Sequence, residues 1–322
     1  MSADIELGLC LAAFGGSRLA DVLDQVAAWG PLHLDVPTDS VLGLVDGRRC
    51  LHEPGYRQDI AAGLKAASVT CVSNSRDTQL LLGPHGRHTD PVCRGDTEAK
   101  RRHAVESALG TLLLADAIDA PAVRLQVGCP DFARWLSWWG SDVSWSDNVA
   151  EFITHMRPLL RTAGNTGVDI LLEPHPKQIV YDRESAELLL DAAATVTDRL
   201  RLCVDPANLA ATGHDPVDAV MGWDGRMAAV HAKDLQLWRG SGAPRGAGWS
   251  RYGPQPAIRF RALGHGELDW SRIVGALADE EFRGVLYLEH EDALLPREQS
   301  IGQGLAMMRS LLPAGPAQGR TW

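Results

Sequence analysis

The sequence predicts an α/β protein folded as a closed (β/α)8 barrel, or TIM barrel, and three observations support this prediction. Short apolar runs alternate with helical segments along the 322 residues. Eight strand–helix units fit a barrel of about 250 residues with insertions. The turn after the first strand reads Ala-Ala-Phe-Gly-Gly-Ser, which is not the Gly-rich dinucleotide fingerprint of an open doubly wound sheet.

The N-terminal half supplies the first four units. Asp96 is expected to be a helix N-cap because apolar residues recur at helical spacing after it. Ser146 and Asp147 are expected to open the next helix. The expected strands are 7–14, 31–36, 69–73 and 122–127, and the expected helices are 18–29, 56–67, a segment from 96 and a segment over 149–160.

The C-terminal half supplies the last four units. Its strands are the runs Ile-Leu-Leu-Glu, Leu-Cys-Val-Asp, Ala-Ala-Val-His and Leu-Tyr-Leu-Glu, and such apolar runs are typical of buried parallel strands. Each run ends on a charged or titratable residue. These four strand-end residues are Glu173, Asp205, His231 and Glu289. The helices are expected near 183–194, 216–223, 269–278 and 297–311.

We expect one domain over residues 1–322, with two long loops and a short tail. The loops are expected at about 129–146 and 236–262, and the C-terminal tail at 313–322. Loops of this length at the mouth of a barrel are more often functional than idle.

Composition excludes several classes of partner. The formal net charge of −10, with no basic stripe, argues against nucleic acid. No apolar stretch approaches 18 residues, and the N-terminus lacks a basic region followed by an apolar one, so neither a membrane span nor a secretory signal is expected. The six cysteines show no Cys-x-x-Cys spacing, and we interpret them as reduced side chains of a cytoplasmic protein.

The strand-end residues predict a metal site. The active site of a barrel lies at the carboxyl ends of its strands, where all four stand. One such residue alone is often a helix N-cap or an ion-pair partner, but four on consecutive strands are hard to explain as caps. Glu173 and Asp205 each precede a proline, which favours extended backbone. Three carboxylates and one imidazole suit Mn²⁺ best, with Mg²⁺ or Co²⁺ as alternatives.

Two further residues share a face with strand-end residues. His175 and Lys233 each stand two positions after one of them, and residues i and i+2 of a strand point to the same side. An imidazole suits proton transfer near neutral pH, while a hydrogen-bonded supporting role is the alternative for His175. Lys233 could bind a substrate oxygen, or it could form an ion pair with Asp234 or another carboxylate.

Five motifs resemble the sugar phosphate isomerase/epimerase family, which has the xylose isomerase-like TIM barrel. They are Leu-Glu-Pro-His (172–175), Val-Asp-Pro-Ala-Asn-Leu (204–209), Val-His-Ala-Lys-Asp (230–234), Leu-Gly-His-Gly-Glu-Leu-Asp-Trp (263–270) and Leu-Glu-His-Glu-Asp (288–292). The resemblance implies that the strand-end residues bind the metal. It also implies that Glu173 and Glu289 are catalytic, because the matching glutamates of related ketose epimerases exchange the substrate proton.

The chain departs from many of these relatives at one position. Asn208 stands where they carry a histidine in Asp-x-x-His. An asparagine can orient a carboxylate or bind a substrate hydroxyl but cannot act as a base, and this gives more weight to His175 as the proton-transfer residue.

The expected function is a divalent-metal-dependent isomerase or epimerase that acts on a keto-sugar or polyol through a metal-stabilised enediolate. The alternative is a lyase on the same scaffold. It would be an inosose-type dehydratase, or an enzyme that cleaves a 3-keto-glycoside, including a C-glycoside, by β-elimination. A third reading is a non-catalytic sugar-binding barrel. The residues alone do not decide which sugar is used.

The two long loops carry the substrate signals. Trp135 and Trp139 belong to a Trp-rich segment, and tryptophan stacks on the C–H faces of sugars. The alternative for this segment is a hydrophobic lid or a subunit contact. Arg261 ends the second loop and could bind an anionic group or a neighbouring subunit. The expected partners are a sugar or glycoside and a second copy of the chain, with a hetero-oligomer as the alternative.

Overall fold

A computed structural model describes residues 4–132, 145–223, 225–237 and 258–312. Contacts divide the chain into two compact units, which we describe separately. Unit 1 comprises Met1–Ala13 and Val204–Trp322, and unit 2 comprises Phe14–Cys203. The expectation of a single domain over residues 1–322 stays a prediction.

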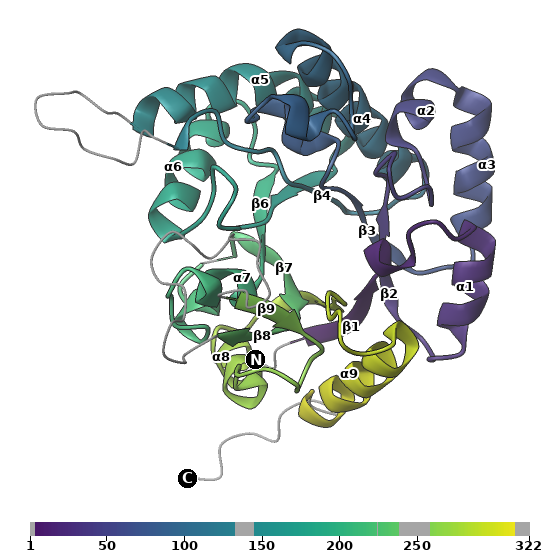
Figure 1. Ribbon diagram of the computed structural model, residues 1–322, viewed down its shortest axis with the longest axis vertical. Helices are drawn as coiled ribbons and strands as arrows, with labels where there is room; N and C mark the ends of the chain where they lie inside the picture. Colours follow the sequence, from purple (N-terminus) through teal and green to yellow (C-terminus); the bar gives the residue numbers. More distant parts are fainter. Residues whose placement is uncertain (1–3, 133–144, 224, 238–257, 313–322) are drawn as a thin grey trace, which may run out of the picture. The chain divides into compact units, whose positions relative to one another are not determined.

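The fold class is the predicted (β/α)8 barrel. Eight parallel strands follow the order of a closed barrel, β1-β10-β7-β6-β5-β4-β3-β2. In unit 1 these are β1 (Asp4–Cys10), β7 (Met227–Ala232) and β10 (Arg283–Leu288). In unit 2 they are β2 (His33–Pro37), β3 (Val69–Asn74), β4 (Ala122–Leu125), β5 (Asp169–Leu172) and, except for its last residue, β6 (Leu200–Val204). Figure 1 carries labels for β1, β2, β3, β4, β6 and β7 of this barrel.

The helices of unit 2 begin and end on local signals. Asp96 accepts the amide hydrogen of Ala99 at 2.9 Å and caps α4, as the sequence predicts. Asp182 caps α6 through the amide of Ser185. The α-helices are α1 (Leu19–Ala27), α2 (Gly47–His52), α3 (Pro54–Leu64), α4 (Thr97–Ala117), α5 (Trp145–Thr166) and α6 (Arg183–Ala194).

Unit 1 adds a hairpin to its barrel strands. Strand β8 (Asp234–Leu237) pairs antiparallel with β9 (Ile258–Arg261), and Figure 1 shows this hairpin near α7. Leu235 of β8 is buried with Ala207 and Ala210 of α7, which explains this contact. The α-helices of the unit are α7 (Pro206–Ala211), α8 (Trp270–Asp279) and α9 (Arg297–Leu311).

Four segments differ from the expectations. The helix expected over 216–223 is a short 3-10 turn, Asp218–Val220, because Pro216 and Gly222 leave little room for an α-helix. The first strand stops at Cys10, and a 3-10 turn covers Leu11–Phe14. Helix α2 and the β8–β9 hairpin were not expected.

Among the described residues, none of the helices combines the length and apolar composition that crossing a bilayer requires.

Replacing Gly110 by alanine is expected to lower the free energy of unfolding by about 1–3 kcal/mol, the usual cost of overpacking. Gly110 lies on α4, and a methyl group there would collide with the backbone carbonyl of Gly47 on α2. Gly275 on α8 is the matched control, because a methyl group there meets nothing within 4 Å. Urea unfolding should show a loss for Gly110→Ala only, and equal loss in both variants would refute the close packing of α2 on α4.

Candidate metal centre

Three of the strand-end residues come together within unit 1. His231 lies in β7, while Asp205 and Glu289 directly follow β6 and β10. Each offers one potential ligand atom, and these atoms lie within 4.8 Å of one another. Asp205 and His231 are fully buried, and the Glu289 side chain is 11% exposed. Two carboxylates and an imidazole at this spacing are chemically suited to a divalent cation.

The pairing of β10 with β7 places Glu289 beside His231. Tyr287 is the register partner of His231, and the amide of Glu289 donates to the carbonyl of Ala232 at 3.1 Å. As a result Glu289 Oε2 lies 3.3 Å from His231 Nδ1. The edge of the Tyr287 ring packs against the imidazole, with ring centroids 6.3 Å apart. The parallel ladder therefore fixes both groups.

Asp205 uses its two carboxylate oxygens differently. Oδ1 caps α7 by accepting the amides of Ala207 and Asn208 at 2.8 and 3.3 Å. Oδ2 lies 3.0 Å from the ammonium of Lys233. The backbone of Asp205 is extended, as expected of a residue before proline. The two sequence interpretations, cap and ligand, are therefore compatible in one side chain.

Lys233 is a buried cation within this group of carboxylates. Its Nζ lies 2.9 Å from Glu289 Oε2 and 2.9 Å from Glu291 Oε2, in addition to Asp205. The ammonium also lies 4.3 Å from the centroid of the Phe260 ring. Lys233 thus forms the ion pairs that the sequence analysis gave as its alternative role, though with other carboxylates than Asp234. Its contact with substrate stays a prediction.

Asp234 instead organises the turn of the Leu-Gly-His-Gly motif. Its carboxylate accepts the amides of Leu235, Gly264 and Leu268 at 2.9–3.1 Å. A methyl group on Gly266 would collide with this carboxylate. The glycine of the motif is therefore explained by a close backbone approach, and the aspartate of Val-His-Ala-Lys-Asp by loop structure.

Glu173, the fourth strand-end residue, lies in unit 2 directly after β5. Its side chain is 2% exposed. Glu173 Oε2 accepts from Arg124 Nη1 at 2.8 Å and from Gln126 Nε2 at 2.9 Å. These two partners were not identified from the sequence. The signal was an arginine inside the apolar strand Ala-Val-Arg-Leu, since a buried charge requires a partner.

His175 and Asn208 occupy ordered local structure. His175 is half-buried, its amide donates to the carbonyl of Val180 at 2.9 Å, and its Nδ1 accepts the amide of Lys177 at 3.1 Å. Asn208 is fully buried on α7, three residues after Asp205. Both are compatible with the roles expected from the sequence, which stay predictions.

The predicted substrate contacts of the two loops remain open. Trp135 and Trp139 lie outside the described residues. Arg261 lies in β9, where its Nε is 3.0 Å from Asp292 Oδ2. Burial opposes the charge of Asp292, but the amides of Ala262 and Leu294 and the Arg261 guanidinium outweigh this effect and lower the pKa of Asp292 to about 2. Arg261 is thus held by a firmly ionised partner.

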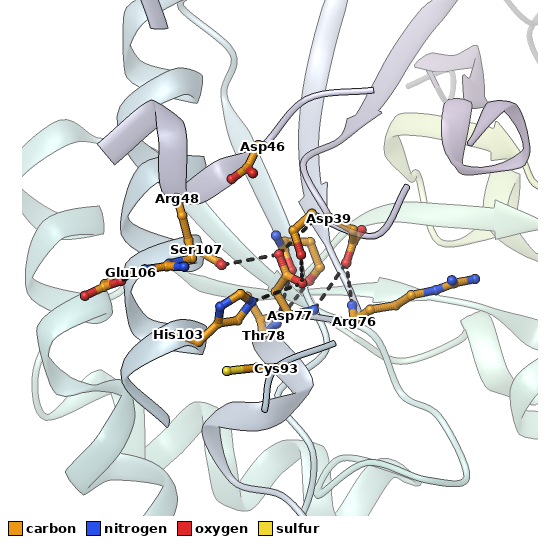
Figure 2. A network of polar contacts seen from close by, with 12 residues as sticks. Asp39, Asp46, Arg48, Arg76, Asp77, Thr78, Cys93, His103, Glu106 and Ser107 are labelled. Carbon is orange, nitrogen blue, oxygen red and sulfur yellow. Dashed lines mark hydrogen bonds and ion pairs between the residues drawn. The ribbon is translucent and has the colours of Figure 1, made fainter. Parts of the chain in front are cut away.

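In two loops of unit 2, an aspartate of each loop accepts hydrogen bonds from the other loop, which forms a buried network (Figure 2). Asp39, after β2, accepts the amides of Ser75 and Arg76, which follow β3. Asp77 in turn accepts the amide and hydroxyl of Ser40 at 2.9 and 2.7 Å. His103 of α4 lies 3.3 Å from Asp77. The network joins the loops at the carboxyl ends of β2 and β3.

This network predicts a pH-dependent stability. Burial raises the pKa of Asp39 to about 6, and the nearby Asp77 adds to the shift. A carboxyl group whose pKa is higher in the folded than in the unfolded state stabilises the folded state when it is protonated in both, below pH ~4. A pKa difference of about two units corresponds to about 3 kcal/mol, and this stabilisation is lost as the pH rises through 6. Asp39→Asn should remove that dependence. Urea unfolding at pH 4.5 and 7.5 tests it, and parallel behaviour of wild type and variant would contradict it.

Comparison with known proteins identifies a family. The family described as xylose isomerase-like TIM barrel matches residues 51–311. No curated protein matches the chain.

Three solved structures illustrate the shared fold. A 3-keto-D-glucoside 4-epimerase from E. coli has 14% identity and a TM-score of 0.66, with 95% of this chain and 100% of that chain covered. A probable 3-DHS dehydratase from Bacillus anthracis has 14% identity and a TM-score of 0.63, covering 94% and 98%. The IOLI protein with a binding zinc atom has 16% identity and a TM-score of 0.62, covering 95% and 97%.

Proposed function

The chain belongs to the xylose isomerase-like TIM barrel family, and on that premise we propose that it is a divalent-metal-dependent enzyme that isomerises or epimerises a keto-sugar. The observation that carries the proposal is the buried group of Asp205, His231 and Glu289. Lys233 supplies one positive charge to the carboxylates of Asp205, Glu289 and Glu291, and a divalent cation would offset the negative charge that remains.

We propose that Glu173 completes the ligand set. It follows β5 as Asp205 follows β6 and Glu289 follows β10, and the carboxyl ends of barrel strands face the site. Three carboxylates and one imidazole favour Mn²⁺, with Mg²⁺ or Co²⁺ as alternatives. The zinc in the IOLI structure supports metal binding in this fold.

The chemistry follows from the donor set. A cation bound there would polarise a substrate carbonyl and acidify the adjacent C–H. Glu173, Glu289 and His175 are the proposed proton-transfer residues. Lys233, which forms ion pairs with Asp205 and Glu289, is the proposed residue for binding a substrate oxygen. Return of the proton to another face or carbon gives epimerisation or isomerisation.

A lyase is the second candidate, because a structure named as an epimerase and one named as a probable dehydratase share this fold. The dehydratase from Bacillus anthracis has nearly the same structural similarity to this chain as the epimerase from E. coli. In a lyase the same enediolate would expel a leaving group β to the carbonyl, as water from an inosose or as the aglycone of a 3-keto-glycoside. A sugar or glycoside is the proposed substrate in both cases.

One experiment separates the two candidates. The protein is incubated with Mn²⁺ and a panel of keto-sugars, inososes and 3-keto-glycosides in deuterium oxide, and the products are followed by NMR. Deuterium incorporation without loss of a group supports the isomerase or epimerase, and release of water or aglycone supports the lyase. If no substrate incorporates deuterium and none releases a group, both candidate functions are contradicted. Homo-oligomer formation and a cytoplasmic location stay predictions.

A further inference from the structure

One oxygen of Glu173 is held from two sides within unit 2. The Arg124 guanidinium and the Gln126 amide both donate to Oε2, at 2.8 and 2.9 Å. Arg124 and Glu173 are 3% and 2% exposed, so water competes little with these bonds. Hydrogen bonds to a charged group are shorter and stronger than neutral ones, and here both members of the main bond are charged.

Arg124 is itself fixed by residues from other strands. Its Nε lies 3.2 Å from Oδ2 of Asp35, a fully buried residue of β2, and its Nη1 donates to Ser75 Oγ at 3.1 Å. The rigid fork of the guanidinium therefore joins β2, β4 and β5 at their carboxyl halves. A planar group anchored on both sides cannot follow a moving carboxylate, so it defines where Oε2 must be.

We propose that Arg124 is a positioning residue that fixes Glu173 as a one-oxygen metal ligand. The inference rests on the proposed function, because it requires a cation at the strand-end residues. With Oε2 held by Arg124 and Gln126, Glu173 must act on the cation through Oε1. Carboxylates otherwise bind divalent cations through one or both oxygens.

This constraint has a chemical consequence. Four protein ligands that each use one atom leave two of six octahedral positions, enough for two adjacent oxygens of a sugar. A Glu173 that also used Oε2 would take one of them. Arg124 would therefore preserve the positions through which substrate is chelated. Glu289 differs, because its Oε2 contacts the ammonium of Lys233, which stands on a flexible four-carbon chain.

The test uses Co²⁺ as the probe, because its visible absorption reports coordination number and its titration reports affinity. Arg124→Met is expected to weaken Co²⁺ binding by about 10–100-fold, the usual effect of losing a residue that orients a ligand, and to change the absorption spectrum. Arg124→Lys keeps the charge but not the fork, so an intermediate spectrum is expected. Turnover should fall mainly through KM, since substrate loses a coordination position.

The matched control is Lys100→Met. Lys100 is a cation of the same unit, 1% exposed, and its Nζ lies 2.7 Å from Asp90, so its replacement also removes a buried cation and its ion pair. This variant should lose stability while keeping the wild-type Co²⁺ affinity and spectrum. If Lys100→Met and Arg124→Met change the Co²⁺ affinity and spectrum to the same extent, the effect comes from the loss of any buried charge, and the proposal is overturned.

The outcomes separate this inference from the proposed function. If wild type binds no Co²⁺, the metal centre and the inference both fail. If wild type binds Co²⁺ and Arg124→Met shows the same affinity and spectrum, only the positioning role fails. Should Arg124→Met not fold, Arg124→Lys becomes the test, because it keeps the charge but removes the fork that fixes Oε2. A changed Co²⁺ spectrum in Arg124→Lys supports the proposal, and a wild-type spectrum and affinity overturn it.

Discussion

Glu289→Gln is expected to reduce turnover below detection and to weaken Mn²⁺ binding, while the fold remains intact. The amide keeps the size of the side chain but removes the charge that a divalent cation needs. It also ends the ion pair in which Glu289 Oε2 lies 2.9 Å from Lys233 Nζ. Activity assays and a Mn²⁺ titration test the function, and circular dichroism tests the fold.

Another glutamate of unit 1 provides the control. Glu280, at the end of α8, accepts the amide of Gly222 at 2.7 Å and contacts none of the strand-end residues of unit 1 in the part of the chain that is described. Glu280→Gln should keep wild-type turnover and metal affinity. If Glu289→Gln retained a tenth of the wild-type rate with unchanged Mn²⁺ affinity, Glu289 would be neither ligand nor catalytic residue.

His175→Ala is expected to lower kcat by roughly 10²–10⁴, the usual contribution of a general acid or base. In the neutral ring the hydrogen bond from the Lys177 amide occupies Nδ1, which assigns the proton to Nε2. Metal affinity should change little, because His175 is outside the ligand set. Single-turnover kinetics and a Mn²⁺ titration together measure the two effects.

Two results would contradict a proton-transfer role for His175. A variant that binds metal weakly and regains the full rate at high Mn²⁺ would show that His175 supports the ligand set and transfers no proton. A pH profile of kcat that is unchanged by the substitution would point the same way.

Several parts of this fold could be predicted from sequence because their signals are local. The charged residue that ends each of four apolar runs marked the carboxyl ends of β5, β6, β7 and β10. The helices α6 and α9 cover the residues expected for them; Asp182 caps the start of α6, and α9 begins directly after Pro296. Asp205, His231 and Glu289 come together because the strand ladder brings strand ends together.

Other parts depend on tertiary contacts that no local pattern encodes. Helix α2 has only six residues and is held by the cap from Asp46 and by close packing on α4. Strand β8 begins two residues after the end of β7. No turn signal in the sequence separates the two strands, so β8 was assigned to the loop that follows β7. The partners of Glu173 lie 47–49 positions away in sequence, and only the folded sheet reveals them.

The most direct test of the account is a titration of the purified, metal-depleted protein with Mn²⁺, followed by calorimetry and by electron paramagnetic resonance. We expect about one bound Mn²⁺ per chain, with binding lost when Asp205 is replaced by asparagine, because three oxygen ligands and one nitrogen suit this ion. Absence of binding to the wild-type protein by both methods, and equally with Mg²⁺ and Co²⁺, would contradict the metal centre and the function built on it.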